Sequence, residues 1–300
     1  MTTEIKLTPS FADVHYTFPE YPRQVRIESA FSCPMACVVC HAWGSFKTPE
    51  RPKTFASMEF IESILQDIAS WEKPLHEIVP VDFSEWPAYP KWYEMGQMID
   101  RYIPDTMMSL PTTGISFSDE ENLKKLASIK TLKWLNFSIN AYFEETWERF
   151  HRRPRRLMAR ILELPERFRD LRPDVTINIS MVYDPLITSV LEAELFEAHW
   201  KAKDFRVGIN TASYVKNPKR KPEVPLTIAC RSIFDGLVVF ADGKVGTGCC
   251  FDSNAELTVG GFPKGKLLDI WKGAELKALG ELHNSGKRTE LDLCRNCTFS

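Results

Sequence analysis

The stretch Cys33-Pro-Met-Ala-Cys37-Val-Val-Cys40 carries three thiols within eight residues. Three thiolates at this spacing can hold three irons of a cubane cluster and leave the fourth iron without a protein ligand. The segment 24–32 reads as a short strand, so the cysteines fall on the loop that leaves its carboxyl end. The alternative is a structural zinc site with His41 as fourth ligand, although compact zinc sites usually pair two separated Cys-x2-Cys units.

A second set of cysteines lies near the carboxyl terminus. The chain has eight cysteines, and none lies between Cys40 and Cys230. The last pair has the Cys-x2-Cys spacing of iron–sulfur or zinc ligands. Four ligands would complete a second cluster and leave one thiol over, which must be one of the two adjacent cysteines. The five members of this set are Cys230, Cys249, Cys250, Cys294 and Cys297.

Helical and strand patterns alternate after the first cysteine loop. Such alternation is typical of a parallel α/β barrel, in which active sites lie at the carboxyl ends of the strands, as the cysteine loop does here. With the first strand, the pattern gives six β/α units. Helices are predicted over 59–71, 92–102, 119–128, 153–168 and 191–201, and strands over 77–83, 106–110, 135–140, 175–182 and 205–210.

Composition indicates an ordinary soluble globular protein. The 300 residues are 44% hydrophobic, which is enough to bury the cores of one large domain and a smaller one, and the net charge is −2. No signal peptide opens the sequence, and no apolar run approaches ~18 residues. We therefore expect a cytoplasmic, reduced protein with neither a membrane nor a nucleic-acid partner, whose cysteines are metal ligands and reactive thiols rather than disulfides.

A strand followed by Cys-x3-Cys-x2-Cys resembles the radical SAM superfamily, and the carboxy-terminal cysteines resemble its SPASM and twitch extensions. The resemblance covers roughly residues 24–297. It implies an α/β fold with a partial (β/α)6 TIM-like barrel over 23–225, an amino-terminal extension over 1–22, and a small auxiliary [4Fe-4S] domain over 226–300. A polar, proline-rich connector at 216–225 would join the two domains.

The same resemblance implies the cofactors. In that family the open iron chelates S-adenosylmethionine, and one electron splits the molecule into methionine and a 5′-deoxyadenosyl radical that abstracts hydrogen. Two [4Fe-4S] clusters, S-adenosylmethionine as a consumed cosubstrate, and a one-electron donor such as flavodoxin or ferredoxin are therefore expected. The basic run 151–156 could meet an acidic donor, but a solvated helix end is the simpler interpretation.

The resemblance also suggests roles for the cysteines. Cys33, Cys37 and Cys40 would hold the first cluster. Residues 234–250 look like a hairpin with an Asp-Gly turn, and the family ligand usually follows the turn glycine by five residues, where this chain has Gly248. On a strand, Cys250 would point to the same face as that position and Cys249 to the opposite face, so Cys249 would face away from the second cluster. We assign Cys230, Cys250, Cys294 and Cys297 to the second cluster, and Cys249 to chemistry.

Two alternatives to that assignment stay open. A β-bulge among the nearby glycines would exchange the roles of the adjacent cysteines. The surplus thiol could also be only a small buried apolar residue, as free cysteines commonly are.

Polar residues at the strand ends correspond in order to the family's cofactor contacts. Glu85 lies where relatives grip the methionine amino group, although the usual glycines are missing. Thr112-Thr113-Gly114 looks like the family's Thr-Asn-Gly turn, and Ser138 and Asn140 lie in a segment that touches the ribose or carboxylate. Val39 departs from the family, which often has an aromatic residue near the adenine; His41 and Trp43 are candidates to replace it.

The layout is closest to radical SAM enzymes that act on aminoglycosides and aminocyclitols, and most like an aminoglycoside epimerase. The radical would remove a hydrogen from a sugar carbon, and Cys249 would return one from the opposite face. A polycationic substrate needs carboxylates aimed into the barrel. Glu28 and Asp82 are the candidates, a structural ion pair being the alternative for each. Other interpretations are an aminocyclitol dehydrogenase, which needs no free thiol, a peptide-modifying maturase, and a zinc-stabilised binding protein.

Overall fold

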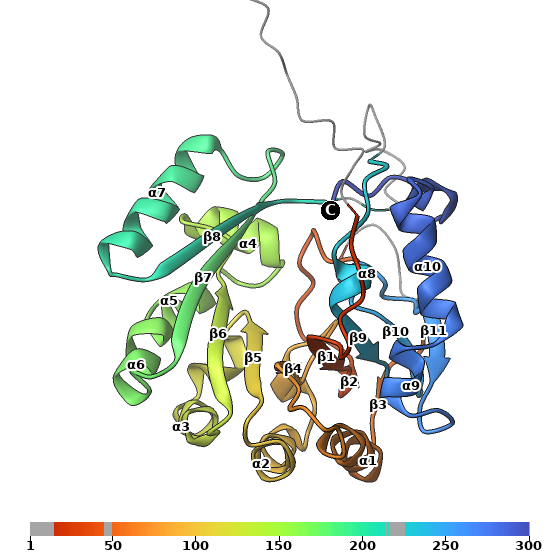
Figure 1. Ribbon diagram of the computed structural model, residues 1–300. Coiled ribbons are helices and arrows are strands. Elements are labelled where there is room, and N and C mark those ends of the chain that lie inside the picture. The colour runs from red at the N-terminus through yellow and green to blue at the C-terminus, as the bar shows by residue number, and fades with distance from the viewer. Residues whose placement is uncertain (1–14, 45–49, 214, 216–225, 300) are drawn as a thin grey trace, which may run out of the picture.

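A computed structural model describes residues 15–44, 50–213, 215 and 226–299. Its strands form one nine-stranded sheet in the order β11-β10-β9-β1-β4-β5-β6-β7-β8, and a small sheet of β2 and β3 (Figure 1). The strands are β1 (Gln24–Ile27), β2 (Ala30–Phe31), β3 (Thr54–Phe55), β4 (Glu77–Val79), β5 (Met107–Thr112), β6 (Leu132–Ser138), β7 (Thr176–Tyr183), β8 (Arg206–Thr211), β9 (Gly236–Val239), β10 (Lys244–Thr247) and β11 (Thr258–Gly261).

Helices cover the outer side of the curved sheet (Figure 1). In α1, the Ser57 hydroxyl accepts a hydrogen bond from the Phe60 amide at the first turn, and an apolar stripe that includes Ile61 and Leu65 is buried. The helices are α1 (Met58–Ala69), α2 (Trp92–Tyr102), α3 (Glu120–Ser128), α4 (Glu144–His151), α5 (Arg156–Leu162), α6 (Leu164–Leu171), α7 (Val190–Ala202), α8 (Ser232–Asp235), α9 (Leu267–Trp271) and α10 (Ala274–Asn284), with 3-10 turns η2 (Trp86–Ala88), η3 (Ile115–Ser118) and η4 (Arg288–Glu290).

Six strands, β1, β4, β5, β6, β7 and β8, run parallel and lie in the sheet in the order in which they occur along the chain. Crossover helices connect them, as a parallel sheet requires. This is the predicted partial (β/α)6 barrel, and the fold class is confirmed. The carboxyl ends of the six strands therefore meet at one rim, where the cysteine loop follows β1 and β2.

The carboxy-terminal region is built onto the same sheet. Strand β9 pairs in parallel with β1, with Gln24 opposite Gly236 and Ile27 opposite Val239. Strands β10 and β11 then add in antiparallel order. Gly243 makes the β9–β10 turn at φ 86°, a conformation that glycine adopts without strain. The predicted connector, 216–225, lies outside the described residues, so the predicted domain boundary stays a prediction.

Several predictions of secondary structure differ from the structure. The helix expected over 153–168 is two helices, α5 and α6, because Pro165 has no backbone N–H and occupies the first turn of a new helix. The strand expected over 77–83 ends at Val79, directly before Pro80. Helix α4 was not expected, and its last residue, His151, is buried rather than part of a solvated helix end.

Candidate active site

The first cysteine loop leaves β2 at the rim of the barrel. Its turns are closed by backbone hydrogen bonds from Cys40 to Cys37 (3.0 Å) and from Gly44 to Cys40 (3.0 Å). Two backbone N–H groups point at sulfur atoms: that of Met35 at Cys33 Sγ (3.4 Å) and that of Trp43 at Cys40 Sγ (3.3 Å). Such donors stabilise negative charge on sulfur, as metal-bound thiolates require.

The carboxyl end of α4 holds this loop in place. The Val38 amide donates to the Phe150 carbonyl (2.9 Å), and His151 Nδ1 lies 3.1 Å from Cys37 Sγ. Burial lowers the pKa of His151 to about 4, so the ring is neutral and carries one N–H. This role of His151 was not predicted from the sequence; the apolar spacing of Trp147 and Phe150 in front of it was the signal that this face of α4 is buried.

The side chains of His41 and Trp43 make contacts away from the three thiols. His41 Nε2 lies 3.0 Å from the Ser213 carbonyl, and its ring packs on Phe251 with centroids 4.6 Å apart. Trp43 donates its indole N–H to the Phe83 carbonyl (2.6 Å). Because His41 contacts the Ser213 carbonyl and Phe251, the structure does not favour it as a fourth zinc ligand beside the first three cysteines.

Glu85 organises the turn after β5. Its carboxylate accepts hydrogen bonds from Thr112 Oγ1 (2.5 Å) and from the Thr113 amide (2.7 Å). Gly114 follows with φ 84°. The Thr113 hydroxyl is buried and has no hydrogen-bond partner among the described residues. A buried hydroxyl without a partner costs free energy, so this atom is a candidate contact for a bound ligand.

Ser138 is the last residue of β6, and Asn140 lies two residues beyond it. Asn140 has a left-handed backbone with φ 63°; its side-chain oxygen accepts from the Val182 amide (2.9 Å), and its Nδ2 donates to the Ser138 carbonyl (3.0 Å). Asn140 Nδ2 also lies 3.5 Å from His151 Nε2. The Ser138 hydroxyl accepts from Asn136 Nδ2 (3.1 Å). Asn140 therefore joins two strand ends to the histidine that contacts Cys37.

The second cysteine set surrounds one small buried cavity. The Cys230 amide donates to His283 Nδ1 (3.2 Å), and the Phe299 amide donates to Cys297 Sγ (3.4 Å). All five thiols of the set line this cavity, Cys249 and Cys250 included. The structure thus brings together the residues that were assigned to one cluster from positions up to 67 residues apart in the sequence.

The adjacent cysteines lie beyond the end of β10, which stops at Thr247. The strand-parity argument therefore does not apply to them directly. Burial raises the pKa of Cys250 to about 12, and Cys230 and Cys297 add to this rise; burial also raises the pKa of Cys249 well above its usual range, with a contribution from Cys294. Cys250 alone also borders the barrel cavity.

The barrel encloses a cavity of about 660 Å³. Asp82 lies in its wall, where Asp82 Oδ1 is 3.5 Å from Arg26 Nη1 and Oδ2 is buried with no hydrogen-bond partner in the described part of the chain. Burial, against the opposing effect of Arg26, raises the pKa of Asp82 to about 7. The polar lining consists of Arg23, Gln24, Arg26, Glu77, Asp82, Ser109, Asn136 and Cys250.

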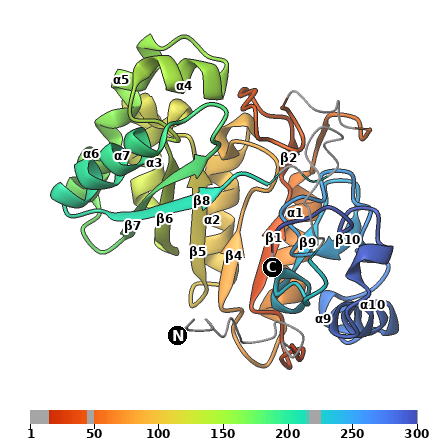
Figure 2. The same cartoon turned by 90° about the horizontal axis from the view of Figure 1, so that it is seen from above.

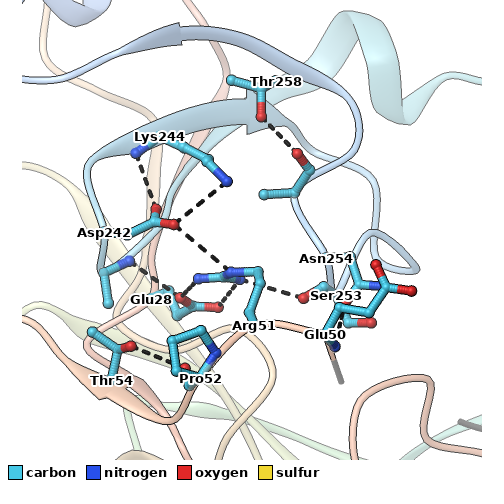
Figure 3. A network of polar contacts seen from close by, with 12 residues as sticks. Glu28, Glu50, Arg51, Pro52, Thr54, Asp242, Lys244, Ser253, Asn254 and Thr258 are labelled. Carbon is cyan, nitrogen blue, oxygen red and sulfur yellow. Dashed lines mark hydrogen bonds and ion pairs between the residues drawn. The ribbon is translucent and has the colours of Figure 1, made fainter. Parts of the chain in front are cut away.

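Glu28 is engaged in a structural network, which corrects its expected role at the substrate. Figure 3 shows Arg51 between Glu28 and Asp242. Arg51 Nη2 and Nη1 donate to the two Glu28 oxygens (2.5 and 3.1 Å), and the Ala241 amide adds a third hydrogen bond (3.1 Å). Glu28 does not line the barrel cavity. Of the two carboxylates predicted to face the substrate, Asp82 lines the barrel cavity and Glu28 does not.

Comparison with known protein families decides the identity of the barrel. The model of the radical SAM superfamily matches residues 27–193. The chain belongs to the radical SAM superfamily. An iron-sulfur cluster-binding domain, SPASM, matches residues 230–298, which include the second cysteine set. No curated protein matches the sequence.

Solved structures share the fold at low sequence identity. BtrN in complex with AdoMet and 2-DOIA is 16% identical over 95% of this chain and 94% of that one, with a TM-score of 0.62. Streptococcus suis SuiB bound to the precursor peptide SuiA is 13% identical over 93% of this chain and 70% of that one, with a TM-score of 0.67. Native anSMEcpe with bound AdoMet is 13% identical, covering 91% and 89%, with a TM-score of 0.65.

Membership of this superfamily, with a SPASM domain, implies S-adenosylmethionine and two [4Fe-4S] clusters. The residues fit these groups. The loop of Cys33, Cys37 and Cys40 offers thiols with N–H donors to two of them, and the buried Thr113 hydroxyl at the same rim lacks a partner among the described residues. Five cysteines around one cavity offer the four ligands of the second cluster. Among those same residues, no helix is long and apolar enough to cross a membrane.

Proposed function

We propose that this radical SAM enzyme is an epimerase that inverts one sugar carbon of an aminoglycoside, converting neomycin C to neomycin B. The observation that carries the proposal is the pair of adjacent cysteines at the junction of the second cysteine set and the barrel. Five thiols line a cavity where one cluster needs four. One thiol is therefore free for chemistry beside a substrate in the barrel.

The surplus thiol has a defined task in an inversion. Cys33, Cys37 and Cys40 would hold the first cluster, which together with S-adenosylmethionine would supply a radical able to take a hydrogen atom from the sugar. Cys249 then gives its S–H hydrogen to the opposite face of that carbon. One electron and one proton from an external donor restore the thiol. Because S-adenosylmethionine is consumed in each turnover, the inversion is effectively irreversible.

The cavity supports a cationic substrate of moderate size. Its volume of about 660 Å³ lies within the range of small-molecule sites. The unpartnered Oδ2 of Asp82 can accept a hydrogen bond from a substrate ammonium group. Arg23 and Arg26 line the same cavity, so they would turn the ammonium groups toward Asp82 and Glu77. Glu85, Thr113, Ser138 and Asn140 remain the proposed contacts for S-adenosylmethionine.

We assign Cys249 as the hydrogen donor and Cys250 as the cluster ligand. This choice follows the sequence prediction; in addition to burial, Cys230 and Cys297 raise the pKa of Cys250, and Cys250 and Cys294 raise that of Cys249, so both thiols lie within the set. The reverse assignment is favoured by a different observation, namely that Cys250 borders the barrel cavity.

Matched Cys249→Ser and Cys250→Ser variants test which cysteine donates hydrogen and which one binds the second cluster. We expect Cys249→Ser to keep about eight irons per chain and to cleave S-adenosylmethionine without forming inverted sugar, and Cys250→Ser to lose about four irons. Exchange of these two patterns would reverse the assignment. Inverted product from both variants would show that no cysteine of this pair donates hydrogen.

A dehydrogenase that converts an alcohol to a ketone is the second candidate. It would use the same radical and pass one electron to the second cluster, for which the cavity offers four ligands without Cys249. BtrN in complex with AdoMet and 2-DOIA shares the fold. A dehydrogenase would release a product two mass units lighter and would not need Cys249. For either activity we propose a flavodoxin or ferredoxin as electron donor and a cytoplasmic location.

A further inference from the structure

Three arginines form an uncompensated cationic surface where α4 meets α5. Arg152 ends α4 with φ 53°, and Arg156 begins α5. Arg152 and Arg156 are exposed and Arg153 is half-buried. None of the three is in an ion pair within the described part of the chain, whereas the neighbouring Arg155 pairs with Glu145 (2.9 Å). We call Arg152, Arg153 and Arg156 the α4–α5 arginines.

The first cysteine loop lies directly beneath this surface. The residue before Arg152 is His151, whose Nδ1 is 3.1 Å from Cys37 Sγ, and the residue before that, Phe150, accepts the Val38 amide at 2.9 Å. The view from above also places α4 and α5 on the side of the barrel rim that carries this loop (Figure 2). A protein seated on the α4–α5 arginines would therefore lie over the element that contacts Cys37.

We propose that the α4–α5 arginines dock an acidic one-electron carrier protein that reduces the first cluster. The carrier loses one electron, the cluster gains one, and no atom is exchanged. Positive charge on the docking face attracts an acidic carrier over a long range and accelerates encounter, and this attraction is screened by salt. The proposal rests on the radical SAM assignment and is independent of the sugar substrate.

The test is stopped-flow oxidation of a flavodoxin hydroquinone by the cluster-loaded enzyme with S-adenosylmethionine and no sugar. Arg152→Gln/Arg153→Gln/Arg156→Gln is compared with wild type at low and at high salt, and the same three positions changed to Glu give a stronger perturbation. Lys264→Glu/Lys277→Glu/Lys287→Glu is the control, because these lysines are exposed in the carboxy-terminal region. The extent of reduction by excess dithionite, read by electron paramagnetic resonance, shows that each variant holds its clusters.

At low salt we expect the Gln variant to be reduced about tenfold more slowly than wild type, and the Glu variant more slowly still. The difference should shrink at high salt, the control should stay within about twofold of wild type, and dithionite should reduce all variants equally. A wild-type rate in the Gln and Glu variants, an equal loss in the control, or a wild-type rate that salt does not change would each overturn the proposal. Neither the rate of flavodoxin oxidation nor the extent of reduction by dithionite depends on epimerase activity.

Discussion

Substitution of Arg51 by Met should destabilise the protein strongly, and more at high pH than at low pH. The Arg51 side chain is 8% exposed and that of Glu28 is fully buried. The guanidinium also lies between two aromatic rings, 4.5 Å from the centroid of Phe31 and 4.7 Å from that of Phe240. Methionine keeps apolar volume between the rings but leaves Glu28 with the Ala241 amide as its one hydrogen-bond partner among the residues that the structure describes.

Removal of one partner of a buried ion pair costs about 3–5 kcal/mol, because the remaining charge is left unpaired. Burial already raises the pKa of Glu28 despite Arg51, and without Arg51 this pKa must rise further. A carboxyl whose pKa is raised by folding stabilises the fold below its unfolded pKa and loses that contribution as pH increases through the folded pKa. The penalty should therefore be small near pH 5 and large near pH 8.

The assay is thermal unfolding of the cluster-loaded protein under argon at both pH values. A loss of several kcal/mol corresponds to a decrease on the order of 10 °C in the unfolding midpoint at pH 8. The control is Glu28→Gln/Arg51→Met, which removes both charges and should recover most of the loss. A midpoint for Arg51→Met within about 2 °C of wild type at pH 8, or equal losses at both pH values, would refute the reasoning.

Three further predictions concern the cofactor and substrate sites. Cys33→Ala should lower the iron content by about four atoms per chain and abolish cleavage of S-adenosylmethionine; iron analysis with unchanged content would contradict its role as a ligand. Thr113→Val should weaken S-adenosylmethionine binding by about 0.5–1.5 kcal/mol in calorimetry without lowering the unfolding midpoint, since the lost hydroxyl has no described protein partner. Burial raises the pKa of Asp82 to about 7, so the unfolding midpoint of wild type should decrease as pH increases from about 4 through 7. The midpoint of Asp82→Asn should not show this decrease. The same pH dependence in both proteins would contradict the prediction.

Local patterns predicted the barrel and the first cluster loop well. Cys33, Cys37 and Cys40 lie within one short segment, and the strand and helix periods depend on neighbours along the chain. Both can therefore be predicted from local sequence. Pro80 and Pro165 account for two of the errors. Pro80 directly follows the last residue of β4, and Pro165 lies in the first turn of a new helix, where apolar periodicity alone would have continued one helix.

Contacts between residues far apart in the sequence could not be predicted from local patterns. Glu28 looked like a free carboxylate at a strand end, but its partners are Arg51 and the Ala241 amide, 23 and 213 residues away. His151 looked like the start of a solvated basic run, yet it contacts Cys37 across 114 residues. Such pairings depend on which elements the sheet brings together. The second cysteine set could be recognised without the fold, because thiolates are the usual ligands of iron–sulfur clusters and the number and spacing of cysteines are visible in the sequence.

The central claim, inversion by a thiol hydrogen donor, is tested most directly by anaerobic turnover of neomycin C with S-adenosylmethionine and reductant in deuterated water. Mass and proton spectra of the sugar then report what was transferred. We predict an inverted product with one carbon-bound deuterium, because an S–H hydrogen exchanges with solvent before it is delivered. A product two mass units lighter and free of deuterium would contradict the account and establish an oxidation instead.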